Sequence, residues 1–217
     1  MIAFFLDPDG PTTLWDKAWD IWMKGGWAMA FLAVDALLLF GLGVHVLQRL
    51  IGKRFRTVHE KSLRLWLEHP EYREGKIGRL MGEATQARTL EESATFFAGL
   101  HHSELAPIAR DLKVMKVCIA AAPLLGLLGT VTGMLATFGA LAVGSGGDKT
   151  MAAVSRGISE ALITTETGLV IALPGMFFHY QLGRLRDFYD AFLQHLETLC
   201  AQWLYRSIER RRRGDAA

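Results

Sequence analysis

Apolar residues dominate three long stretches of the chain, and each stretch has the length of a membrane-spanning helix. They cover residues 26–50, 117–143 and 161–180. The first contains one acid, Asp35, the third contains Glu166, and the second has no charged residue. A helix of about 20 apolar residues crosses the hydrocarbon core of a bilayer. The pattern therefore predicts an all-α integral membrane protein with three transmembrane helices.

The segment before the first apolar stretch has an amphipathic pattern. Trp15, Trp19 and Trp22 recur at i, i+4 and i+7, with charged residues on the other faces. Indole rings favour the interface between lipid and water. We expect a helix lying along this interface, with Gly25-Gly26 as the break before the first span. The alternative is an outward extension of that span.

Shorter helices are predicted between the first and second apolar stretches. We expect them near 56–69, 77–87 and 90–102, interrupted around Pro70 and Gly75. Thr89 and Glu92 have the spacing of a capping box, which marks the start of the last of these helices.

The chain after the third apolar stretch carries a hydrophobic stripe with helical spacing. Its members are Leu185, Phe188, Phe192, Leu196, Leu199 and Trp203. From Leu185 onward no Gly or Pro intervenes before Gly214, so we expect the third helix to continue into this region. The stripe needs a cover, either the loop helices or copies of itself. The basic block 210–213 is interpreted as a solvated tail and not as a nucleic-acid site.

Lysine and arginine are distributed unevenly, and this predicts the orientation. Twenty lie in 49–116 and 184–213, whereas only four lie in the N-terminal segment and in the connection 144–160. Basic residues are retained on the cytoplasmic side. The predicted order is 1–25 outside, 26–50 spanning, 51–116 cytoplasmic, 117–143 spanning, 144–160 outside, 161–180 spanning and 181–217 cytoplasmic.

Composition supports this class and excludes others. The 217 residues are 51% hydrophobic and 21% charged, with a net charge of +2, which is too apolar for a disordered chain and not basic enough to imply nucleic acid. Cys118 and Cys200 follow no metal or redox spacing, so we expect two reduced, packed thiols. The sequence shows no nucleophile–base set, phosphate loop or metal cluster. It therefore predicts neither an enzyme nor a cofactor.

Small and hydroxyl residues line one face of the second apolar stretch. Gly126, Thr130, Gly133 and Thr137 fall at i, i+4, i+7 and i+11, and Gly129 adds a GxxxG spacing with Gly133. Small residues let two helices approach closely in a membrane. This face is too polar for lipid, and three spans are too few to cover it. We therefore expect a homo-oligomer.

Acids and hydroxyls gather at the start of the third apolar stretch. Glu160 and Thr164 lie on one helical face, whereas Thr165 and Glu166 are rotated away from it. A carboxylate inside a membrane marks an ion-pathway hypothesis by default. For Glu160 the alternative is a position at the outer interface, reached by water, and Asp35 either conducts or accepts a hydrogen bond from a neighbouring helix.

Two motifs in these stretches resemble a known family. The runs Ala122–Met134 and Gly157–Leu169, followed by Ala172–Pro174, are similar to those of the MotA/TolQ/ExbB proton-channel family, closest to its ExbB branch. The resemblance implies a homopentamer in a Gram-negative inner membrane, assembled with an ExbD-like single-span partner. Such a complex drives a TonB-like protein and thereby outer-membrane transport. It also implies no catalysis and no cofactor.

The resemblance also assigns residues. Thr130, Glu160 and Thr165 match the polar residues that line the family's pore, whereas helical geometry alone pointed to Thr164 beside Glu160. Glu166 is an additional acid and is expected either to conduct or to face a neighbouring subunit. Gly126, Gly129 and Gly133 are expected to pack helices.

Other functions remain open at this stage. A TolQ-like subunit for envelope maintenance shares the motifs and differs only in its partner. A membrane scaffold without ion flow would tolerate neutralisation of its acids. A secondary transporter is disfavoured, since no internal repeat is visible.

Overall fold

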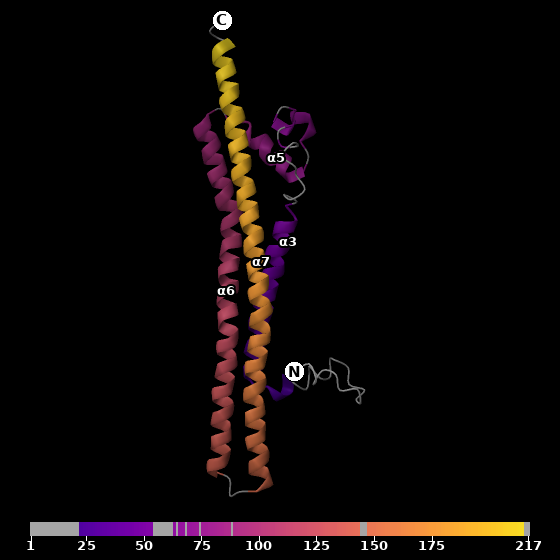
Figure 1. The fold of residues 1–217 in the computed structure, drawn as a ribbon, viewed down its shortest axis with the longest axis vertical. Coiled ribbons are helices and arrows are strands. Elements are labelled where there is room, and N and C mark those ends of the chain that lie inside the picture. Colours follow the sequence, from indigo (N-terminus) through magenta and orange to yellow (C-terminus); the bar gives the residue numbers. More distant parts are fainter. Residues whose placement is uncertain are drawn as a thin grey trace. The chain divides into compact units, whose positions relative to one another are not determined.

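The computed structural model describes residues 22–53, 63, 65–67, 69–73, 75–87, 89–143 and 147–214. All regular elements within these residues are helical, which confirms the all-α class. They are α3 (Ala28–Ile51), the 3-10 helix η2 (Pro70–Tyr72), α5 (Gly75–Ala84), α6 (Leu90–Val143) and α7 (Asp148–Gly214). In Figure 1, α6 and α7 are the longest helices, with 54 and 67 residues.

Three of these helices, α3, α6 and α7, each contain a stretch that is long and apolar enough to cross a membrane. The chain is therefore an integral membrane protein by length and composition, as the hydropathy pattern predicts. Before α3, residues 22–24 are helical and 25–27 form a turn, in which Gly26 has φ +65°. This left-handed conformation favours glycine. The predicted break is confirmed, whereas Trp15 and Trp19 lie outside the described residues.

Helix α6 joins two segments that the sequence pattern kept apart. The hydroxyl of Thr89 accepts a hydrogen bond from the amide of Glu92 at 3.1 Å, so the expected N-cap is present. The helix then continues to Val143 without a break at residue 102. The helix expected near 90–102 and the span expected from 117 are therefore parts of one helix, because buried Leu105, Ile108 and Met115 maintain the helical period between them.

Helix α7 is continuous from the third apolar stretch into the C-terminal region. The predicted continuation is confirmed, with Pro174 contained inside the helix.

Between the first and second apolar stretches, α5 begins at Gly75, two residues earlier than expected, and ends at Ala84, three residues earlier. Gly75, the first residue of α5, has φ +71°. This left-handed backbone conformation favours glycine and marks the start of the helix. The segment expected near 56–69 lies mostly outside the described residues.

The chain divides into two compact units, and the long helices contribute to both. Unit 1 takes in the chain up to Leu39 together with Val117–Met176, and unit 2 takes in Phe40–Lys116 and the chain from Phe177 onward. In unit 1, Met29 and Leu32 of α3 form a buried cluster with Ala122 of α6 and Ala172 of α7. A stripe of α3 thus covers α6 and α7 within this unit.

Unit 2 has a core of larger side chains. Its fully buried members include Phe97 and Ile108 of α6, Met81 of α5, and Leu193 and Leu196 of α7. The hydrophobic stripe predicted after the third span is therefore only partly correct. Leu196 and Leu199 are buried, but Phe188 is half exposed, and the pattern missed Leu182, Tyr189 and Leu193. Ile77 and Leu80 of α5 line a common cavity with Phe192 and Leu193, so a loop helix covers part of the stripe.

Candidate ion pathway

The two helices that carry the predicted pathway residues meet at glycines in unit 1. A Cβ atom added to Gly133 of α6 would lie 2.8 Å from the carbonyl oxygen of Gly157 in α7. One added to Gly126 would lie 2.9 Å from the carbonyl oxygen of Thr164. Gly129 lies directly against the Thr164 side chain. Only glycine allows the two backbones to come this close.

Helix α7 contributes glycines to the same interface. A Cβ atom on Gly168 would lie 2.6 Å from the carbonyl oxygen of Ala122, and Gly157 lies against the side chain of Thr137. The interface therefore extends over about four turns of α6 and about three turns of α7. Its residues on α6 are Ala122, Gly126, Gly129, Gly133 and Thr137, all buried.

Most of the small-residue face of α6 is covered within a single chain, contrary to the expectation that required an oligomer. Gly126, Gly133 and Thr137 are covered by α7 of the same chain. The expectation that one chain cannot cover this face is therefore wrong for three of its four residues, because the glycines let α7 approach closely. Thr130, the fourth, remains half exposed.

Thr164 and Thr165 differ sharply, although they are adjacent in sequence. Thr164 has no exposed surface, and its hydroxyl lies 3.0 Å from the carbonyl oxygen of Ala161 and 3.5 Å from that of Gly126. Thr165 is half buried and donates to the same Gly126 oxygen at 3.2 Å. Residues one position apart point about 100° apart on a helix, so only one of the two can face α6 squarely. Thr164 therefore belongs to the helix interface, and Thr165 lies at its edge.

Thr130 and Thr165 share one chemical property. The Thr130 hydroxyl donates to the carbonyl oxygen of Leu127 at 2.7 Å, and that of Thr165 donates to Gly126. A hydroxyl has one proton and two acceptor lone pairs. With the proton committed to the backbone, each oxygen can still accept a hydrogen bond from water or from a protonated carboxyl group. Both side chains are partly accessible for this.

Glu160 contacts a residue that the sequence pattern did not connect with it. A Cβ atom on Gly26 would coincide with the Glu160 carboxylate, so this carboxylate lies directly over the Gly26 backbone. Glu160 is partly exposed at this position. The sequence signal was the glycine pair before the first span, which we interpreted only as a break. The turn that begins α3 also makes room for the acid.

The two remaining acids occupy different surroundings. Glu166 is exposed on α7. Asp35 of α3 is 8% exposed, lies within hydrogen-bonding reach of Cys118 on α6, and has one oxygen without a hydrogen-bond partner in the described part of the chain. The contact with Cys118 favours the second prediction for Asp35, an interaction with a neighbouring helix. Among the described residues no group of three His, Cys, Asp or Glu side chains could hold a metal ion.

The chain belongs to the MotA/TolQ/ExbB proton channel family, which matches residues 73–195, more than half of its length. This range includes α5, all of α6 and most of α7. The family is one of channels and not of enzymes. The resemblance seen in the motifs of α6 and α7 is thereby confirmed.

Individual relatives carry ExbB names. An ExbB-like biopolymer transport protein of Synechocystis is 39% identical over 107 residues, 47% of this chain and 42% of the relative. The biopolymer transport protein ExbB of Xanthomonas campestris is 34% identical over 110 residues, 50% of this chain and 41% of the relative. An ExbB homologue of Methanothermobacter thermautotrophicus is 41% identical over 88 residues, 40% of this chain and 30% of the relative. In each case the match covers less than half of the relative.

Proposed function

We propose that this chain is the proton-channel subunit of an ExbB–ExbD–TonB-type complex, which couples the proton-motive force to outer-membrane transport. In this proposal it forms a homopentamer in the inner membrane around an ExbD-like single-span partner and acts on a TonB-like protein. It has no catalytic role. Family membership and the ExbB names of its relatives support the assignment.

The observation that carries the proposal is the pair of half-exposed threonines beside the glycine interface. Thr130 and Thr165 present hydroxyl oxygens at the edge of the α6–α7 interface. Such oxygens can bind water or a partner's carboxyl group where few other polar groups are available. Glu160 adds a group that can be charged or neutral, according to its solvation. The three residues together would bound a proton route shared with the partner.

The close α6–α7 interface supports a mechanical role. The glycines hold the two helices together within one chain. Faces that remain exposed, including Phe138 at 60% and Leu162 at 65%, are then available to lipid or to neighbouring subunits. A potential of 100 mV supplies about 2.3 kcal/mol for each charge that crosses the membrane. This free energy is large enough to bias movement of subunits around a partner.

Proton flux tests the proposal directly. The chain is purified with its co-expressed single-span partner and reconstituted into liposomes that contain a pH-sensitive dye. We expect Glu160→Gln and Thr165→Val each to abolish most of the flux, since each removes a polar group with little change in volume. Thr130→Val should act in the same way. Complex recovery is measured in parallel to confirm assembly.

A matched control keeps the result interpretable. Thr198→Val makes the same hydroxyl-to-methyl change at an exposed site far along α7, and it should retain most of the flux. Glu166→Gln is a separate test, which shows whether the additional acid on α7 conducts or only packs. Full flux in a Glu160→Gln, Thr165→Val double variant would contradict the pathway and leave a non-conducting scaffold.

Orientation and stoichiometry need separate measurements. We infer a periplasmic N-terminus and a cytoplasmic C-terminus from the lysine and arginine asymmetry. Cysteines introduced at the exposed positions Met23 and Tyr205 should react with an impermeant reagent in spheroplasts only at the first site. Labelling at the second site alone would reverse the topology. Native mass spectrometry in lipid nanodiscs should show five copies of this chain.

A further inference from the structure

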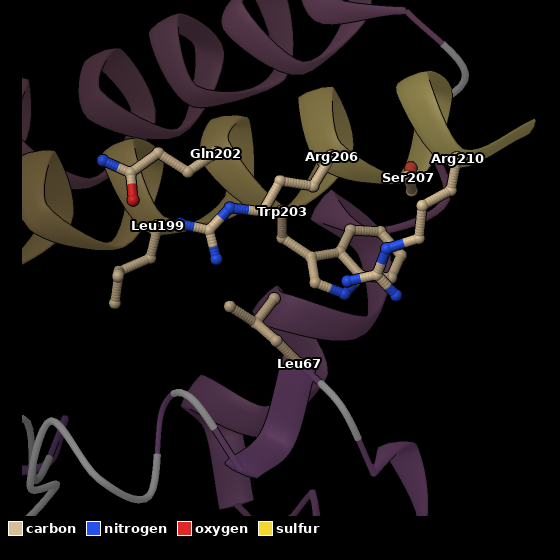
Figure 2. A pocket seen from close by; sticks show the side chains of 7 residues that line it. All are labelled: Leu67, Leu199, Gln202, Trp203, Arg206, Ser207 and Arg210. Carbon is tan, nitrogen blue, oxygen red and sulfur yellow. The ribbon is translucent and has the colours of Figure 1, made fainter. Parts of the chain in front are cut away.

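A cavity of about 520 Å³ lies in unit 2, on the C-terminal part of α7. Arg206 and Arg210 contribute to its wall, together with Trp203 and Leu199, and Leu67 lines it from another segment. Figure 2 shows both arginine side chains reaching from α7 toward the side on which Leu67 lies. The cavity is remote in sequence from every residue assigned to the ion pathway.

The charged side chains that the described residues contribute to the cavity are both arginines. Arg206 and Arg210 lie one helical turn apart, so their guanidinium groups can converge on one ligand. None of the described residues that line the cavity carries a carboxylate. No ion pair or hydrogen bond engages either arginine in the described part of the chain. Nearby arginines differ, since Arg186 pairs with Asp187 and Arg213 pairs with Glu209.

The rest of the wall is apolar and aromatic. Trp203 is half buried and presents part of its indole to the cavity, flanked by the buried side chains of Leu199 and Leu67. An indole face stacks well on a planar ring, and a guanidinium fork binds phosphate oxygens in a bidentate manner. The cavity thus combines sites for an anionic group and for a flat, weakly polar group.

We propose that this cavity binds a soluble phosphate-bearing ligand with a planar ring, the chemistry of a nucleotide. Arg206 and Arg210 hold the phosphate, and the ring lies on Trp203 between the two leucines. The volume falls within the range of about 300–1,000 Å³ that is usual for small-molecule sites. Nucleotide binding here would make the proton-driven complex responsive to the state of the cell, a property that the pathway residues do not supply.

Position along α7 favours a soluble ligand over a lipid headgroup. Trp203 lies 23 residues beyond Tyr180, where the third apolar stretch ends. This corresponds to about 35 Å along an α-helix. A headgroup held in the bilayer surface would not reach a cavity this far from the apolar stretch, whereas a free nucleotide would.

Fluorescence anisotropy tests the proposal with the full chain in lipid nanodiscs. The probe is ATP carrying an N-methylanthraniloyl group, and unlabelled ATP, inorganic phosphate and vesicles of phosphatidylglycerol are the competitors. Arg206→Gln and Arg210→Gln should each weaken probe binding about tenfold or more, because each removes charged hydrogen bonds to the phosphate. Trp203→Phe should weaken it less, since a smaller ring remains.

The matched control is Arg213→Gln. It removes the same charge from the same helix but outside the cavity, and its binding should equal that of the wild type. Circular dichroism of every variant confirms helix content. Saturable binding that ATP displaces, and that only the cavity variants lose, supports the proposal. Absence of saturable binding by the wild type, equal loss in Arg213→Gln, or displacement by vesicles but not by ATP would each overturn it.

Discussion

Helices α6 and α7 pack together in both units, but they do so in opposite ways. In unit 1 their backbones approach through glycines, so that a single added methyl group at Gly133 would lie 2.8 Å from a carbonyl oxygen. In unit 2 the residues between helices are large, and Phe97, Ile108 and Leu193 are fully buried. Polar pairs flank the second core, where His101 lies 3.2 Å from Asp190, and Lys53 pairs with Glu104.

The difference is the one expected between helix packing in lipid and helix packing in water. Lipid is as apolar as a leucine side chain, so helices in a membrane associate through close packing rather than through burial of apolar area. In water, large apolar side chains drive association as they leave the solvent. Where its outer surface is apolar, this pair of helices packs through small residues. Where its outer surface carries charged side chains, the same pair packs through large residues. Volume changes should therefore have opposite consequences in the two units.

The largest effect is expected from shrinking a side chain in unit 2. Leu193→Ala leaves a cavity next to Tyr189 and α5, and it should lower the free energy of unfolding by about 2–5 kcal/mol. Denaturant titration followed by circular dichroism measures the loss. Leu162→Ala, at an exposed site in unit 1, is the control and should cost far less. Similar losses in both variants would remove the contrast between the units.

In unit 1 the free energy of unfolding should fall when a residue is enlarged. Gly133→Ala places a methyl group against the Gly157 carbonyl and the Ala161 backbone, and it should cost about 1–3 kcal/mol by forcing α6 and α7 apart. Gly139→Ala makes the same change on the same helix with nothing within 4 Å, and it should be neutral or slightly stabilising. The same denaturant titration compares them. Tolerance of Gly133→Ala would show that the interface is looser than its geometry indicates.

Alkaline pH should weaken unit 2 through a buried thiol. Burial raises the pKa of Cys200 from 9.0 to about 11, only partly opposed by the charge of Arg73. The unfolded chain therefore loses this proton first, and stability falls as pH rises from 9 to 11. From pH 8 to pH 10 the loss should be about 1 kcal/mol. Cys200→Ala should remove this part of the slope, and an unchanged slope would argue against a buried thiol.

The smallest effect is expected from the Thr164 hydroxyl. Thr164→Val preserves shape but removes hydrogen bonds to backbone carbonyls, including the bond between helices to that of Gly126 in α6 at 3.5 Å. Hydrogen bonds between membrane helices average about 0.6 kcal/mol, and the loss should be of this order. Thr198→Val, exposed in unit 2, should change stability by less than about 0.5 kcal/mol. A loss above about 2 kcal/mol would mean that this hydroxyl dominates the α6–α7 interface in unit 1.

Much of the architecture follows from local pattern. The lengths of the apolar stretches predict three helices that are long enough for a membrane. The helical spacing of the stripe from Leu185 to Trp203 predicts the continuous α7. Thr89 and Glu92 mark the start of α6. These features depend on interactions between residues that are close in sequence, so the amino-acid sequence alone is sufficient to predict them.

Other features depend on partners that are distant in sequence. Period alone placed Thr164 beside Glu160 but could not show that Thr164 is buried against Gly126 and Gly129, while Thr165 remains half exposed. The cover that α7 provides for the small-residue face of α6 was also missed, because the sequence does not say which helix a glycine faces.

The cavity in unit 2 and the contact of Glu160 with Gly26 have the same origin. Leu67 meets Arg206 and Arg210 only after the chain has folded back on α7, and the Glu160 carboxylate reaches Gly26 only once α3 packs on α7. The sequence by itself determined which segments are helical and apolar, since backbone hydrogen bonds and side-chain period act locally. The tertiary structure decided which faces meet, because close packing selects among many sterically possible partners.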